Sequence, residues 1–149
     1  MIPMERGHLA LLMEVGYVYL GMQKYKEAKE VFEGVSCLKQ ESEIPLVALA
    51  GVFFCQGKLK EAVRIYNKAL KLNPESLYAK AYLAESLFFD GDSDAAKKLL
   101  KEVDQAEAKG PVGDFARSLL GAIEKGFTPE KLSQVKELQE YYEKKKKNR

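Results

Sequence analysis

Few residues of this chain have the type and spacing that chemistry would require. His8 is the only histidine, and no cysteine or acid lies at ligand spacing from it, so a surface histidine is the expected interpretation. Asp90, Asp92 and Asp94 imitate the start of a calcium loop, but Ala95 takes the glycine position and Lys101 takes that of the bidentate glutamate. The sequence therefore predicts no catalytic residue, no metal site, no cofactor and no enzymatic activity.

Two other segments resemble ligand-binding sites, but each is better explained as a structural feature. Gly110-Pro111-Val112-Gly113 is too short to cradle a phosphate and follows an expected helix instead of a strand. The last six residues, Lys144 to Arg149, hold five positive charges, whereas the whole chain has a net charge of only +2. The body is therefore mildly acidic, which argues against a nucleic-acid surface, and we interpret the tail as a solvated helix end.

The composition predicts a single soluble, cytoplasmic domain. The chain has 149 residues, of which 46% are hydrophobic and 31% charged, enough for one continuous core. Its longest apolar run, Ile44 to Cys55, is too short to cross a bilayer, and Glu5 and Arg6 interrupt the N-terminus before a signal-peptide core could form. Cys37 and Cys55 fall in different expected helices, so a reduced cytosolic protein is the simpler interpretation.

A pattern of small and large residues recurs every 34 residues. The middle copy begins at Glu43, and the copies before and after it begin at Leu9 and Leu77 with no insertion. Small residues at Ala50 and Ala62 indicate two antiparallel helices that approach closely where they cross. In the middle copy the pattern consists of Leu46, Leu49, Ala50, Phe53, Gly57, Ala62, Tyr66, Ala69 and Pro74.

This period and pattern resemble the tetratricopeptide repeat, a helix-turn-helix unit. The resemblance implies an all-α fold, a right-handed superhelix of three helix pairs at residues 9–42, 43–76 and 77–110. The first and third copies depart from the family pattern, with Leu12 and Lys80 in the usual tryptophan position and with Gln40 and Ala108 in the usual proline position.

Local signals place the helices and their ends. Glycine at Gly57 and Gly91 predicts a left-handed stop after the first helix of a pair, and Asp92 or Ser93 should cap the helix that follows. We expect helices at about His8–Met22, Tyr25–Leu38, Glu43–Gln56, Leu59–Leu72, Glu75–Phe89 and Ser93–Ala108.

Residues 111–143 lack the 34-residue pattern but retain helical spacing. Thr128-Pro129-Glu130 is a strong start signal for a last helix. That helix has an apolar face of Leu132, Val135, Leu138 and Tyr142. The sequence thus predicts a C-terminal capping helix pair, a basic tail at 144–149 and about eight helices in all.

In this repeat family the first helix of each pair lines a concave groove. Carried over to this chain, the partner-binding positions are apolar and rich in aromatic residues, which usually marks a binding surface. The alternative is ordinary core, covered by the leader Met1–Gly7 or by the last helix, and one member of Phe53-Phe54 and of Phe88-Phe89 must be core. The predicted groove residues are Met13, Tyr17, Leu20, Val47, Gly51, Phe54, Tyr78, Ala81, Glu85 and Phe88.

One known use of the fold binds the carboxy-terminal tails of heat-shock chaperones through a clamp of Lys, Asn and Arg. The corresponding positions here hold Met13, Tyr17, Ala48, Tyr78 and Tyr82. None is cationic, so a client carboxylate would find no charge partner, which argues against this use.

A narrower resemblance is to the small repeat chaperones of bacterial type III secretion, which hold needle or translocator subunits before export. It implies a groove that shelters an amphipathic helix or an extended apolar segment of a secretion subunit. It favours a needle subunit over a translocator and suggests a small helical co-chaperone as a second partner, with no membrane insertion. The alternative is a tetratricopeptide adaptor or scaffold unrelated to secretion. The segments that carry the resemblance are Val31-Phe32 through Leu38, Ala84-Glu85-Ser86-Leu87 ahead of Gly91, and Asp114-Phe115-Ala116.

Overall fold

The structure, a computed structural model, describes residues 6–148, and at residues 132, 133, 135 and 136 it describes the backbone alone. Most of the leader Met1–Gly7 therefore lies outside the described residues. Residues 6–148 form helices and turns without a strand, which confirms the predicted all-α class. Their eight helices are α1 (Arg6–Gly21), α2 (Tyr25–Leu38), α3 (Ile44–Cys55), α4 (Leu59–Leu72), α5 (Leu77–Phe89), α6 (Ser93–Ala106), α7 (Pro111–Glu124) and α8 (Pro129–Lys147).

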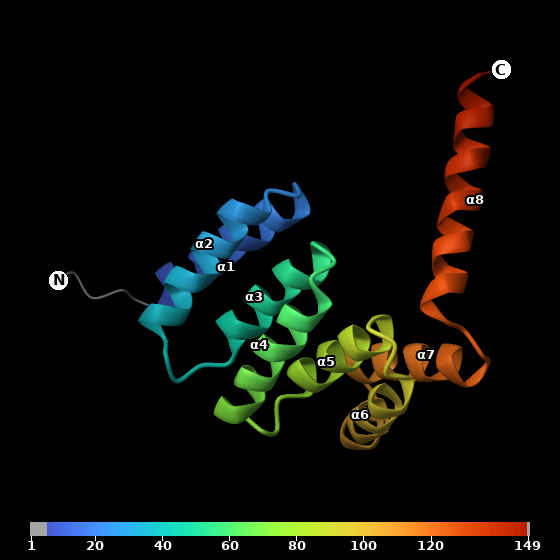
Figure 1. Ribbon diagram of the computed structural model, residues 1–149. Helices are drawn as coiled ribbons and strands as arrows, with labels where there is room; N and C mark the ends of the chain where they lie inside the picture. The colour runs from blue at the N-terminus through green and yellow to red at the C-terminus, as the bar shows by residue number, and fades with distance from the viewer. Residues whose placement is uncertain (1–5, 149) are drawn as a thin grey trace.

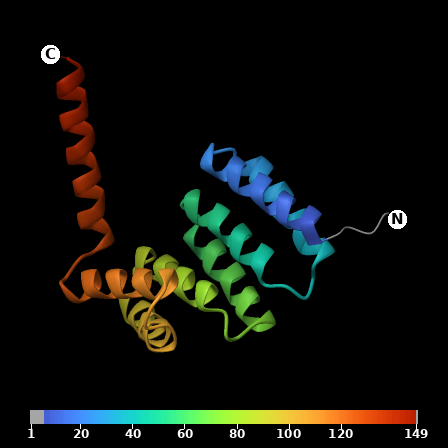
Figure 2. The same ribbon diagram turned by 180° about the vertical axis from the view of Figure 1, so that it is seen from behind.

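Helices α1 to α6 form three pairs that stack in chain order (Figures 1 and 2). The crossing of each pair is built from small residues 34 positions apart. Ala28, Ala62 and Ala96 are all completely buried, and so are Ala50 and Ala84. Because only a small side chain fits where two helix axes come this close, the crossings confirm the predicted repeat.

The turn inside each pair needs one residue with left-handed backbone. Gly57 has a φ of 74° and Gly91 a φ of 95°, as predicted. The equivalent position of the first pair is Gln23, with a φ of 60°. Because this conformation is unfavourable for a residue with a Cβ atom, the first pair closes its turn under strain.

Polar caps fix the starts of three helices. The Ser76 hydroxyl accepts a hydrogen bond from the Ala79 amide at the start of α5, at 3.3 Å. Asp92 Oδ1 accepts from the Ala95 amide at 3.2 Å, and Thr128 Oγ1 accepts from the Lys131 amide at 3.4 Å. Asp92 is therefore a helix cap, and residues 6–148 contain no cluster of acids, histidines or cysteines able to hold a metal ion.

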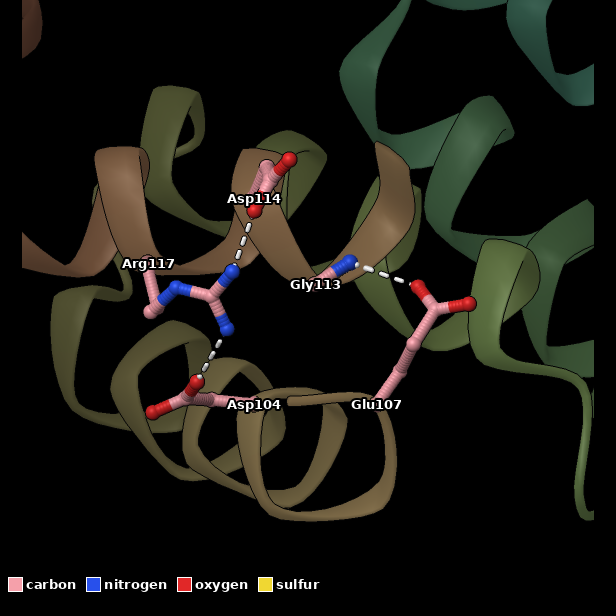
Figure 3. A network of polar contacts seen from close by, with 5 residues as sticks. All are labelled: Asp104, Glu107, Gly113, Asp114 and Arg117. Atoms are coloured by element: carbon pink, nitrogen blue, oxygen red, sulfur yellow. Dashed lines mark hydrogen bonds and ion pairs between the residues drawn. The ribbon is translucent and has the colours of Figure 1, made fainter. Parts of the chain in front are cut away.

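Helix α7 covers the open end of the third pair through a polar network (Figure 3). Arg117 on α7 donates to Asp104 Oδ1 on α6 at 2.9 Å and also pairs with Asp114 one turn away on α7. The Gly113 amide donates to Glu107 Oε2 at 2.8 Å. A side chain at Gly113 would lie 2.0 Å from the Glu107 carbonyl oxygen, so this contact requires glycine.

Helix α8 leaves the body after Phe127 and projects away from the stack (Figures 1 and 2). Among the described residues it packs closely against no other helix. Leu138 and Tyr142, two members of its predicted apolar face, are each 56% exposed, while the side chains of Leu132 and Val135 lie outside the described part of the chain. No helix within residues 6–148 combines the length and apolar content needed to cross a bilayer.

Candidate binding groove

The first helices of the three pairs present one continuous stripe of side chains. On α5 the stripe consists of Tyr78, Tyr82, Glu85 and Phe89, whose spacing of three or four residues places them on one helix face. Helices α1 and α3 supply the rest. We call this surface the groove wall, and it consists of Met13, Tyr17, Leu20, Ile44, Val47, Gly51, Phe54, Tyr78, Tyr82, Glu85 and Phe89.

Two hollows open on the groove wall. The smaller, of about 320 Å³, lies between α1, α3 and α5. The larger, of about 690 Å³, lies between α1, the end of α2 and the start of α3. Tyr17 and Ile44 line both hollows, so the two form one extended surface. None of the α8 residues whose side chains the structure describes lines either hollow.

The smaller hollow is largely aromatic. Tyr17, Val47, Tyr78 and Tyr82 are among the residues that line it. Of its described lining residues, Glu43 alone is charged, and its carboxylate accepts a hydrogen bond from Asn73 Nδ2 at 3.0 Å. A ligand of this hollow therefore meets an apolar surface with one acidic residue at the edge.

Tyrosines from two helices, α4 and α5, lie next to one another at this hollow. The Tyr82 ring lies 6.5 Å from the Tyr66 ring and 6.2 Å from the Tyr78 ring, measured between centroids. Tyr66 is on α4, and its hydroxyl lies 4.0 Å from the position that a Cβ atom at Gly51 would take, which is ordinary van der Waals contact. Burial raises the pKa of the Tyr66 hydroxyl, and the nearby Glu85 carboxylate raises it further.

Glu85 is the acidic group at the centre of the groove wall. It is half-buried, and the described residues offer it neither a hydrogen bond nor an ion pair. Burial raises the pKa of this carboxyl because a desolvated carboxylate is costly. Burial also raises the pKa of Cys55 and of Tyr82, and in both the Glu85 charge adds to the shift.

An aromatic pair forms the other end of the groove wall. The rings of Phe54 on α3 and Phe89 on α5 meet edge to face, with centroids 5.7 Å apart. Phe89 also contacts Phe88, at 5.3 Å between centroids. The wall thus has apolar surface on both sides of Glu85.

The structure separates the predicted groove residues into surface and core. Tyr17 and Tyr78 are 49% and 51% exposed, and the other residues on the surface are half-buried. The prediction is wrong for two residues, because Ala81 is completely buried and Phe88 is 1% exposed. Both belong to the core cluster that α7 completes with Val112 and Ala116. The half-buried predicted residues are Met13, Leu20, Val47, Gly51, Phe54 and Glu85.

Tyr82 and Phe89 take the places on the wall that were predicted for Ala81 and Phe88. Tyr66 and Ile44 were also missed. Tyr66 occupies a packing position of the repeat pattern, and the sequence held no signal that its hydroxyl would lie close enough to Glu85 to feel that charge. Ile44 is 59% exposed, and its signal was its place at the start of an almost wholly apolar helix.

A second apolar surface lies on the outer face of α1, at the end of the stack. Leu11, Val15, Val18 and Met22 follow one another at helical spacing and are 58%, 37%, 61% and 57% exposed. We call these four residues the α1 outer face. No other helix of the described chain covers them, and such a stripe is unusual on the surface of an isolated domain.

Stacked helix pairs with an apolar, aromatic groove define the chain as a helical-repeat protein. Two family models, both described as tetratricopeptide repeat, match residues 53–115 and 9–35. Together they cover more than half of the sequence, so this chain belongs to the tetratricopeptide repeat proteins.

Solved structures share the fold at low sequence identity. The type III secretion translocator chaperone SycD of Yersinia enterocolitica is 19% identical, with a TM-score of 0.72 over 82% of this chain and 96% of SycD. PcrH of Pseudomonas aeruginosa is 17% identical, with a TM-score of 0.72 and the same coverage of both chains. The first repeat domain of Spaghetti (RPAP3), bound to an HSP90 peptide, is 21% identical, with a TM-score of 0.71 over 85% of this chain and 98% of that domain. No curated protein matches the chain in sequence.

Proposed function

We propose that this protein is a cytoplasmic chaperone that shelters an apolar or amphipathic segment of a type III secretion subunit in its groove before export. The observation that carries the proposal is the groove wall itself, an aromatic surface that the described residues of α8 leave open. Each large apolar side chain that a client covers would contribute roughly 1.5–3 kcal/mol. The role needs no catalysis.

Structural relatives support a peptide client. SycD has been solved with a peptide of the translocator YopD, and PcrH with the chaperone-binding regions of PopB and PopD. These complexes involve translocators and lend no support to the needle subunit that the sequence favoured. We therefore place the translocator class first and the needle subunit second.

The match to an HSP90-bound repeat domain does not transfer its ligand to this chain. An acidic peptide tail needs cations in the groove, and the clamp positions are occupied by Met13, Tyr17, Ala48, Tyr78 and Tyr82. Ala48 is moreover 3% exposed, so it offers nothing to a ligand. A carboxylate placed there would lose its hydration without gaining a partner.

The α1 outer face favours a second partner. Its four apolar side chains lie on one face of one helix, which suits an amphipathic helix packed alongside. We assign this face to the small helical co-chaperone that the sequence resemblance suggested. The client and this second partner would then occupy different sides of α1.

The competing proposal is an adaptor or scaffold unrelated to secretion. The hollow between α2, α3 and α4, of about 670 Å³, favours it, because charged residues surround an apolar floor that includes Phe53. Its cations outnumber its acids, with Lys29, Lys58, Arg64 and Lys68 against Glu33 and Glu61. Lys29 and Lys58 lie over the Phe53 ring, at 5.7 and 5.9 Å from its centroid. An adaptor that used this hollow would bind its partner independently of the groove wall.

Two reciprocal variants test the proposal. Tyr78→Glu puts a charge on the groove wall, and Val18→Glu puts one on the α1 outer face, both at exposed positions. We expect complexes purified from the native cells to lose the exported subunit with Tyr78→Glu and the co-chaperone with Val18→Glu, as read by native mass spectrometry. Retention of every bound polypeptide by Tyr78→Glu, at unchanged helicity, would remove the groove from the function.

A further inference from the structure

The groove wall carries one charged side chain, Glu85, that has no hydrogen-bond or ion-pair partner among the described residues. Glu85 is half-buried between Tyr82 on its own helix, Cys55 on α3 and the Tyr66 hydroxyl from α4. None of these neighbours is a cation, and at neutral pH each is a neutral acid. Two partly buried cations of the described chain have acidic partners: Lys80 pairs with Glu102 at 3.6 Å, and Arg117 pairs with Asp104 at 2.9 Å.

A half-buried carboxylate without a partner is unfavourable in the free protein and becomes favourable when a ligand supplies the partner. The described residues of the smaller hollow add only the acid Glu43, so the charge at this hollow is complementary to a cation. The larger hollow is lined by Arg6 and Lys39 as well as Glu41, so the acidic character is confined to the part of the wall near α5. The neighbouring rings of Tyr66 and Tyr82 add faces on which an ammonium or guanidinium group is also stabilised.

We infer that Glu85 is the anchor for a lysine or arginine of the bound segment, flanked on that segment by apolar side chains. This inference rests on the proposed function, because it specifies the client of the same groove. The client is then recognised by a basic residue set within an apolar stripe, and a wholly apolar segment would leave the Glu85 charge buried and unpaired.

The wall also sets the spacing of this pattern. Tyr78, at the hollow, precedes Glu85 by seven residues of α5, and Phe89, at the aromatic pair, follows it by four. At 1.5 Å per residue these separations are about 10 Å and about 6 Å. A helical client aligned with α5 would match them with an apolar residue seven positions to one side of the basic residue and another four positions to the other side.

A displayed library of random 16-residue peptides, selected on the full-length chain, tests the inference without knowledge of the natural client. We expect the enriched peptides to carry one lysine or arginine between apolar residues. A synthetic copy of the best peptide should bind Glu85→Gln roughly 10- to 100-fold more weakly than the wild type, the usual range for a lost charge-assisted hydrogen bond. Glu30→Gln, an exposed site on α2, is the control and should change nothing.

Reversing the charge at position 85 provides a second test of the inference. Selection on Glu85→Lys should enrich aspartate or glutamate in the place of the basic residue. Peptides that lose binding with Tyr78→Glu but bind Glu85→Gln as tightly as the wild type would overturn the anchor and leave the groove function standing. Peptides indifferent to Tyr78→Glu, or a library without any enriched peptide, would count against both the groove and the anchor.

Discussion

Gly16 offers a direct test of the packing that holds the first helix pair together. It lies in α1 where the second and third pairs have Ala50 and Ala84. A Cβ atom at Gly16 would lie 2.4 Å from the Phe32 ring, about 1 Å closer than ordinary van der Waals contact. Phe32 is completely buried and its ring also touches Tyr17, at 5.1 Å between centroids, so it has little freedom to move.

The expected effect of Gly16→Ala is the difference between two terms. Overfilling a packed core costs about 1–3 kcal/mol, whereas replacing glycine by alanine inside a helix gains about 0.5–1 kcal/mol. Gly34→Ala in α2 isolates the second term, because nothing lies within 4 Å of a Cβ atom there. We therefore expect Gly34→Ala to stabilise the protein and the two variants to differ by about 1–3 kcal/mol.

Urea unfolding followed by far-ultraviolet circular dichroism measures both variants under the same conditions. For a domain of this size each kcal/mol should also move the melting temperature by roughly 2–4 °C. Adding Phe32→Leu to Gly16→Ala should recover part of the loss, which a double-mutant cycle would report as a coupling energy. If Gly16→Ala stabilised the protein as much as Gly34→Ala does, the close approach of α1 and α2 at this point would be refuted.

Three further predictions concern strain, charge and the last helix. Gln23→Gly should stabilise the protein by about 1 kcal/mol in urea unfolding, because it removes a left-handed residue with a Cβ atom; a loss would contradict the strain. Burial raises the pKa of Glu85, so the folded protein holds that proton more tightly, and stability should fall as the pH rises from the ordinary glutamate pKa through the raised one. Glu85→Gln should abolish this fall and unfold at a higher urea concentration near neutral pH, and an unchanged pH profile would contradict the burial. Deleting residues 129–149 should change the free energy of unfolding by less than about 0.5 kcal/mol, because the described part of α8 packs closely against no other helix; a larger loss in thermal melting would show that α8 docks.

The repeat made most of the fold predictable from the sequence. The positions of α2 and α4 agree with the expected bounds at both ends, because each lies between a turn residue and a residue that ends a helix. The left-handed glycines followed from the requirement of a tight turn for a residue without a Cβ atom. The sequence predicted that the last two helices cap the stack together, but only α7 packs on the third pair and α8 projects away from it (Figure 1). The apolar residues of α8 allow the helix either to cover the stack or to stand free, so the pattern does not decide between the two.

The groove was predicted less well because a wall position depends on neighbouring repeats. Ala81 and Phe88 are equivalent to Val47 and Phe54 in the pattern, and the latter two do lie on the wall. In the third pair, however, α7 adds Val112 and buries the equivalent residues. The pattern within one repeat contains no information about what the chain places beside it.

Some equivalent positions hold the same residue in all three repeats, and others hold different residues. The identical positions serve the folding of the repeat, and the variable ones serve recognition of a ligand. The helix crossing repeats one solution, since Ala28, Ala62 and Ala96 are identical and completely buried. One wall position holds three different side chains, namely Tyr17, Gly51 and Glu85.

Packing cannot explain this variation, because a position that served only the core would be limited in size, as the crossings are. Each of the three residues instead changes what a ligand meets. Tyr17 lines both hollows, Gly51 leaves the wall without a side chain at its position, and Glu85 provides the charge. The specificity of the groove should therefore reside at this position, and exchanging Tyr17, Gly51 or Glu85 should change which peptides bind more than it changes the free energy of unfolding.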